Sequence, residues 1–136
     1  AVEVCLEIGK PYSTLLTHSK KERPFQIIKI GLNRPREELY ERINLRVEQM
    51  IADGLKEEAQ RVYPYKNNNS LNTVGFKEWF DFWDGKTESE ERVIELIQQN
   101  SRHYAKRQLT WFKRDTEITW FHPTDEENII QHIEVL

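Results

Sequence analysis

The sequence lacks several features that define common classes of protein. Only one cysteine, Cys5, occurs among the 136 residues. This excludes an internal disulfide or a cysteine-rich metal site and fits a reducing cytoplasm best. No apolar run approaches the roughly 18 residues that a membrane-spanning helix needs, and no secretion-signal segment opens the chain. We therefore expect a cytoplasmic protein without a membrane partner, in which Cys5 is a buried packing residue.

Catalytic and metal-binding motifs are also missing. A phosphate-binding loop needs a glycine five residues before its Gly-Lys pair. Val4 occupies that position before Gly9-Lys10, and Phe80 occupies it before Gly85-Lys86. The four histidines are scattered without ligand spacing, and no Ser, His and Asp set can be proposed as a triad. We therefore expect no catalytic residue and no metal ligand within this chain.

The hydrophobic pattern predicts an α/β chain that is mostly helical. Residues 1–8 indicate a helix, although alternating apolar positions leave a strand open; no capping residue precedes them, so we expect the chain to be part of a longer protein. Polar segments predict a linker at 17–24 and a loop at 64–71. The predicted strands are 25–32 and 117–121, and the other predicted helices are 35–53, 55–62, 76–83, 87–112 and 124–136. Two strands are too few for an independent sheet.

Two local patterns refine these helices. Thr87 with Glu90, and Thr124 with Glu127, are capping-box patterns that predict the starts of the last two helices. Four aromatic residues recur at helical spacing and predict a stripe that faces the core. They are Phe76, Trp79, Phe80 and Trp83.

Residues 101–114 carry the strongest local signal for function. This segment contains five basic residues and no acid, interleaved with Tyr104, Trp111 and Phe112. Lysine and arginine bind phosphates, and exposed aromatic rings stack on unpaired bases. Cations at a helix C-terminus also compensate the helix dipole. The overall charge of −3 does not favour nucleic acid, so the residues alone leave both interpretations open.

A second basic group comprises Arg34, Arg36, Arg42 and Arg46. Arg36 stands at a predicted helix N-terminus, where free backbone N–H groups favour an anion and a guanidinium can bind phosphate through two hydrogen bonds. We expect Arg42 and Arg46 instead to pair with Glu38 and nearby acids on a solvated face.

Residues 104–113 (YAKRQLTWFK) resemble the signature of the tRNA dimethylallyltransferase family. Other segments similar to the family follow in its order, and together they span almost the whole chain. They are residues 1–4, 9–11, 36–44, 50–58 and 73–78. Phe76 and Ser101 depart from the family, in which tyrosine and threonine are commoner at these positions.

The resemblance implies a P-loop kinase-like α/β core with a helical insertion that grips the anticodon arm. Residues 1–22 would form the end of that insertion and a linker, and residues 23–136 would form the C-terminal part of the core. The implied reaction transfers a dimethylallyl group from dimethylallyl diphosphate to N6 of the adenosine beside the anticodon. The family's phosphate loop, catalytic Asp and Mg²⁺ ligands would lie upstream, so this chain alone is expected to be inactive. The resemblance does not determine the oligomeric state.

The resemblance also implies binding residues. Arg36 is the candidate for the diphosphate. The residues expected to contact tRNA are Asn72, Thr73, Val74, Gly75, Phe76, Lys77, Lys106, Arg107, Gln108, Leu109, Thr110, Trp111, Phe112 and Lys113. Two alternatives are a stand-alone RNA-binding module and an adenylate isopentenyltransferase that acts on free nucleotide.

Overall fold

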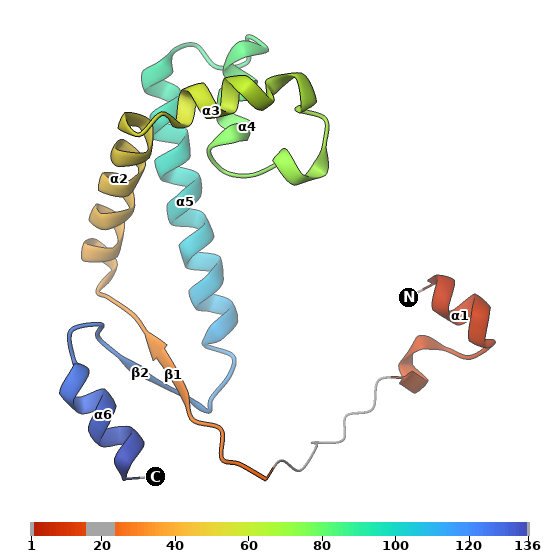
Figure 1. Ribbon diagram of the computed structural model, residues 1–136, viewed down its shortest axis with the longest axis vertical. Helices are drawn as coiled ribbons and strands as arrows, with labels where there is room; N and C mark the ends of the chain where they lie inside the picture. The colour runs from red at the N-terminus through yellow and green to blue at the C-terminus, as the bar shows by residue number, and fades with distance from the viewer. Residues whose placement is uncertain (1, 16–23, 136) are drawn as a thin grey trace.

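A computed structural model describes residues 2–15 and 24–135 of the chain, and Figure 1 shows the order of its elements. The helices are α1 (Val2–Ile8), α2 (Arg36–Ala52), α3 (Leu55–Val62), α4 (Phe76–Trp83), α5 (Glu90–Phe112) and α6 (Glu126–Glu134). The strands are β1 (Lys29–Leu32) and β2 (Ile118–Phe121), and short 3₁₀ turns cover Tyr12–Leu15, Tyr63–Tyr65 and Asn69–Leu71. In the described parts of the chain, no helix is both long and apolar enough to cross a membrane.

The structure confirms the mostly helical α/β class and the two strands. The predicted helices 55–62 and 76–83 match α3 and α4 at both ends, and the first segment is a helix. The helix predicted from Pro35 begins at Arg36, with Pro35 as its N-cap residue. The predicted linker lies almost wholly outside the described residues.

Three expected boundaries are wrong. The strand predicted over residues 25–32 includes only Lys29–Leu32, because the partner strand offers only four residues to pair with. Helix α5 is capped by Ser89, whose hydroxyl accepts a 3.2 Å hydrogen bond from the Arg92 N–H, and not by Thr87. Helix α6 follows Asp125, because the Thr124 hydroxyl is engaged 2.6 Å from Nδ1 of His122.

Cys5 is half-buried and not the core residue that was expected. Helix α1 has no buried residue, and Figure 1 shows α1 standing apart from the other helices. Its side chains therefore have no shared core to enter.

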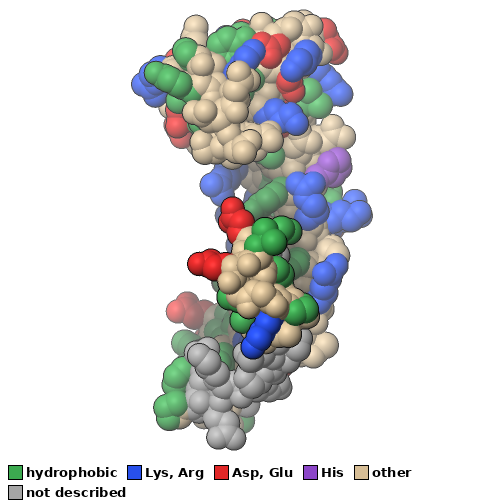
Figure 2. All heavy atoms as spheres, turned by 90° about the vertical axis from the view of Figure 1, so that its right-hand side faces the viewer, with side chains coloured by type: hydrophobic (Ala, Val, Ile, Leu, Met, Phe, Trp, Pro, Cys, Tyr) green, Lys and Arg blue, Asp and Glu red, His purple; other side chains and the backbone are tan. Residues whose placement is uncertain are grey.

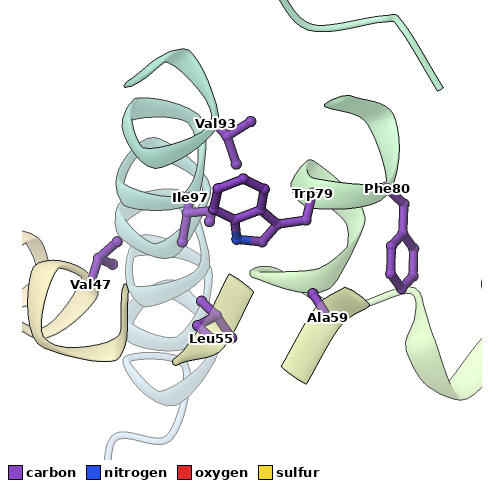
Figure 3. Close-up of a cluster of buried hydrophobic side chains, with 7 residues drawn as sticks. All are labelled: Val47, Leu55, Ala59, Trp79, Phe80, Val93 and Ile97. Carbon is purple, nitrogen blue, oxygen red and sulfur yellow. The ribbon is translucent and has the colours of Figure 1, made fainter. Parts of the chain in front are cut away.

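The core lies where α2, α3, α4 and α5 meet. Its buried side chains are Val47, Leu55, Ala59, Trp79, Phe80, Val93 and Ile97. Figure 3 shows the indole of Trp79 reaching towards Val93 and Ile97 of α5, and only 1% of Trp79 is exposed. Phe76 and Trp83 pack against this cluster, so the predicted aromatic stripe is confirmed.

A buried carboxylate joins α4 to α5. Glu78, which is 5% exposed, accepts a 2.8 Å hydrogen bond from the N–H of Gly75 and a 2.6 Å bond from Nδ2 of Asn100. Gly75 has a φ of +104°, a conformation that other residues rarely adopt. This geometry fixes the N-terminus of α4 against the middle of α5.

The two strands run parallel, with Gly31 opposite Trp120. A Cβ atom at Gly31 would lie 2.6 Å from Cε3 of the Trp120 ring, so the indole occupies the space above the glycine. Lys29 also binds Asp115 at 2.7 Å and Glu117 at 2.6 Å, which ties the start of β1 to the segment that enters β2.

Replacing Trp79 by alanine is expected to lower the free energy of unfolding by about 3–5 kcal/mol, because it leaves a cavity in a close-packed core. Urea denaturation of the chain, followed by circular dichroism, measures the loss. Trp111→Ala is the matched control, because Trp111 is 64% exposed and its loss should cost less than about 1 kcal/mol. Equal losses in the two variants would contradict this description of the core.

Candidate nucleic-acid interface

The C-terminal half of α5 presents cations that are not neutralised by neighbouring acids. Lys106, Arg107, Lys113 and Arg114 are all exposed, and none of them has an ion pair with a residue that the structure describes. Several lysines elsewhere are paired: Lys56, for example, binds Glu90 at 2.5 Å. The positive charge at this end of α5 is therefore available to a ligand.

Helix-dipole compensation explains only part of this group. The last turn of α5 contains no basic residue, and Lys113 is the C-cap residue. The dipole effect falls off within the last turn, so it can account for Lys113 and Arg114. It does not account for Lys106 and Arg107, which lie more than one turn before the helix ends.

Exposed aromatic rings lie among these cations. Trp111, 64% exposed, packs edge-on to Phe112 with 4.9 Å between the ring centroids. The Arg107 guanidinium lies 5.9 Å from the Tyr104 ring centroid. Figure 2 shows Lys and Arg side chains gathered along the middle of one face of the molecule. Cations beside exposed rings suit phosphates and unstacked bases respectively.

The predicted stretch 106–113 divides between two sides of α5. Lys106, Arg107, Thr110 and Trp111 line a shallow outer depression, together with His103. The other side lines a second hollow. Gln108, Leu109 and Phe112 face it together with Asn33, Arg34 and Trp120.

This second hollow lies at the carboxyl ends of both strands. Asn33 and Arg34 follow β1, and Trp120 is the third residue of β2. In open α/β sheets, ligands bind outside the carboxyl ends of parallel strands. The structure therefore brings part of the α5 motif to the edge of the sheet where a ligand is expected.

A polar network connects the loops that follow the two strands. Arg34 pairs with Glu38, and Nε2 of His122 lies 3.2 Å from Oε2 of the same Glu38. The hydrogen bond from His122, and then that from Arg34, lower the pKa of Glu38 below its ordinary value. Sequence reasoning missed this network, since its two ends lie 84 residues apart.

The expected pairing of Arg42 and Arg46 with Glu38 is wrong. Arg34 takes that position, because the Glu38 side chain is engaged with the loop after β2. Both arginines are exposed and have no ion pair among the residues that the structure describes.

Arg36 is the first residue of α2 and is exposed. Its guanidinium carbon lies 5.1 Å from the centroid of the Tyr40 ring, and the corresponding carbon of Arg102 lies 6.0 Å from the same centroid. Arg102 also donates a 2.5 Å hydrogen bond to Asn44. Tyr40 thus connects Arg36, the residue predicted to bind the diphosphate, to Arg102 in α5.

The other predicted stretch, residues 72–77, leads into α4. Asn72, Thr73, Val74 and Lys77 are exposed, and Phe76 is half-buried. Gly75 is buried, and a Cβ there would lie 3.6 Å from Leu55. Its backbone N–H donates to the Glu78 carboxylate. Gly75 therefore fixes the conformation of this turn and is not itself exposed to a ligand.

Glu78 was not among the predicted site residues, although the Gly-x-x-Glu spacing of a capping box could have indicated it. Its bond to Asn100 places the 72–77 turn beside α5. Lys106 is six residues further along the same helix, about 9 Å at 1.5 Å per residue. One predicted stretch is thus packed beside α5 and the other lies at its C-terminal end. That their residues bind tRNA stays a prediction.

Comparison with known proteins identifies the family. The family model described as IPP transferase matches residues 1–115. The chain belongs to the IPP transferase family. The tRNA dimethylallyltransferase 2 of Parabacteroides distasonis is 57% identical to it over 133 residues. The tRNA dimethylallyltransferase 1 of Phocaeicola vulgatus is 56% identical over 133 residues.

The match covers 98% of this chain but only 44% of each of these two relatives. It corresponds to the C-terminal part of an IPP transferase.

Two solved IPP transferase structures share the fold. The tRNA isopentenylpyrophosphate transferase of Bacillus halodurans superposes with a TM-score of 0.72 at 37% identity, over 85% of this chain and 40% of that one. The corresponding enzyme of Staphylococcus epidermidis gives 0.71 at 32% identity, over 99% of this chain and 45% of that one. The chain thus shares the fold of this family, which contains a P-loop-like core.

Replacing Glu38 by glutamine tests the network at the strand ends. A carboxylate whose pKa is lowered on folding stabilises the folded state above its unfolded pKa, and this stabilisation is lost as the pH falls through the folded value. Glu38→Gln should therefore lower stability at about pH 7, and the difference from the unaltered chain should shrink and vanish as the pH falls through the lowered pKa of Glu38. Denaturation across this range measures it. Glu41→Gln, on the exposed side of α2, should show no such trend; a pH-independent difference for Glu38→Gln would contradict the assignment.

Proposed function

We propose that this chain is the C-terminal part of a tRNA-modifying prenyltransferase. The complete enzyme would move a dimethylallyl group from dimethylallyl diphosphate to N6 of the adenosine next to the anticodon. This chain supplies binding residues for tRNA and diphosphate. The observation that carries the proposal is the group of exposed, unneutralised cations beside exposed aromatic rings in the C-terminal half of α5.

The anticodon arm is the partner that this surface fits best. Its phosphates attract Lys106 and Arg107, and its loop contains unpaired bases that can stack on rings such as Trp111. The target adenine must also leave its stack before a transferase can reach it. We propose that both stretches, 72–77 and 106–113, contact the arm. A tRNA substrate implies a cytoplasmic location.

Arg36 is the proposed ligand of the diphosphate. A guanidinium at the first position of α2 adds its charge to the backbone N–H groups of the helix N-terminus, where anions bind readily. The ring of Tyr40 contacts the guanidinium groups of both Arg36 and Arg102. We assign residues 1–22 to a helical tRNA-binding insertion and its linker, and residues 23–136 to the core.

Mg²⁺ would supply charge neutralisation to the departing diphosphate. The described residues contain no group of three His, Cys, Asp or Glu side chains that could hold a metal ion. We place the ligands of the ion upstream of this chain, so no step through Mg²⁺ is assigned to its residues.

The double substitution Lys106→Ala/Arg107→Ala should weaken binding of an anticodon stem-loop by about tenfold or more. It should also reduce the slope of log affinity against log salt concentration by about 1.5, because two phosphate contacts are lost. Fluorescence anisotropy across a salt series measures both quantities.

The matched control is Arg42→Ala/Arg46→Ala, which removes two exposed, unpaired cations from α2. It should leave the affinity within about twofold. Circular dichroism establishes that each variant is folded. If the α5 variant binds as tightly as the unaltered chain, this surface is not the RNA interface and the proposal fails.

The isolated chain is expected to transfer no dimethylallyl group to the stem-loop, because the residues present include no phosphate loop. Incubation with radiolabelled dimethylallyl diphosphate and Mg²⁺ measures the transfer. A complete IPP transferase such as that of Bacillus halodurans serves as the positive control. Turnover by the 136-residue chain would show that its own residues include the catalytic group.

A further inference from the structure

A hollow that borders the 72–77 turn takes no part in the surfaces described above. It lies between the asparagine-rich turn and α4. Its polar lining consists of four asparagines, Asn67, Asn68, Asn69 and Asn72, and of the charged residues Lys66, Lys77, Asp81, Asp84 and Lys86. The three consecutive asparagines are all exposed. The hollow shares Asn72 and Lys77 with the stretch proposed to contact tRNA, so the two surfaces are continuous.

The asparagine side chains are not engaged in the turn that carries them. Asparagines in turns usually hydrogen-bond to their own backbone two residues further on. Here the turn is closed by backbone groups: the N–H of Asn68 donates to the carbonyl of Tyr65 at 2.9 Å, and that of Leu71 donates to the carbonyl of Asn68 at 3.0 Å. None of the amides of Asn67, Asn68 and Asn69 is hydrogen-bonded to a residue in the described ranges.

The charges around the hollow are largely neutralised, and one cation is left over. Asp84 is held by Lys66 and by the hydroxyl of Tyr63, which lies 2.6 Å away. Lys86 binds Asp81 at 2.7 Å. Lys77 is exposed and has no ion pair among the described residues. A ligand therefore meets three free amides and one free ammonium group.

We propose that Asn67, Asn68 and Asn69 extend the RNA interface by contacting ribose 2′-hydroxyl groups, with Lys77 on an adjacent phosphate. Amides donate and accept hydrogen bonds, which matches the ribose 2′-hydroxyl, itself a donor and an acceptor. The 2′-hydroxyl distinguishes RNA from DNA at a contact of this kind. This inference rests on the proposed function, because continuity with the 72–77 turn is what selects RNA as the ligand.

The test compares the chain with its Asn67→Ala/Asn68→Ala/Asn69→Ala variant, on an RNA stem-loop and on the DNA stem-loop of the same sequence. No residue other than glycine has a positive φ in the described segments, so alanine fits this turn without strain. The variant should bind RNA about tenfold more weakly, while DNA affinity changes by less than about twofold. The salt slope should stay unchanged, because no charge is removed.

Gln60→Ala/Asn128→Ala is the matched control, because it removes two exposed amides elsewhere and should leave both affinities unchanged. The Lys106→Ala/Arg107→Ala variant distinguishes failure of the asparagine contact from failure of the proposed function. If it loses RNA affinity while the triple variant does not, the asparagine contact is overturned and the proposed function stands. If the triple variant loses RNA and DNA affinity equally, the sugar contact is overturned. If the Lys106/Arg107 variant keeps full affinity, the proposed function itself fails.

Discussion

The packing of Trp79 and Glu78 against α5 is the constraint on which the rest of this structure depends. The indole contributes the largest apolar surface that is fully removed from water, and the adjacent carboxylate joins Gly75 to Asn100. Trp79 contributes apolar packing, and Glu78 contributes hydrogen bonds that fix the orientation of α4 relative to α5. Because both belong to the same turn of α4, the turn at 72–77 cannot shift along α5 without exposing the indole and leaving a buried carboxylate unpaired, which is costly.

Helix α5 divides its length between two tasks. Val93 and Ile97 are fully buried and contribute to the core, whereas no residue after position 100 is buried within the described range. The second half therefore contributes little to cohesion and is free to carry exposed rings and cations. A rigid helix anchored in the core presents such side chains more accurately than a loop does.

The features that could be predicted from the sequence are those that depend on residues close together in the chain. The stripe that contains Trp79 and Phe80 follows from helical spacing, and the ends of α3 and α4 follow from glycine and aromatic positions. The cap of α5 was misplaced because Thr87 and Ser89 are both good capping residues, and the choice depends on the backbone. The partner of Glu38 could not be predicted, since His122 reaches it only once β1 and β2 are side by side. The family signature located the α5 motif, but only the structure shows that Gln108 and Trp111 face different hollows.

The contact of Trp120 with Gly31 carries a consequence for how such chains vary. The indole lies where a side chain at position 31 would stand, so the two positions share one volume. A relative with a larger residue at position 31 needs a smaller one at position 120, and also room beside Ile118, whose Cγ2 would lie 2.8 Å from the added Cβ. The residues at positions 31 and 120 are therefore expected to vary together in size among relatives. Where they do, the distance between the loops that follow β1 and β2 is preserved.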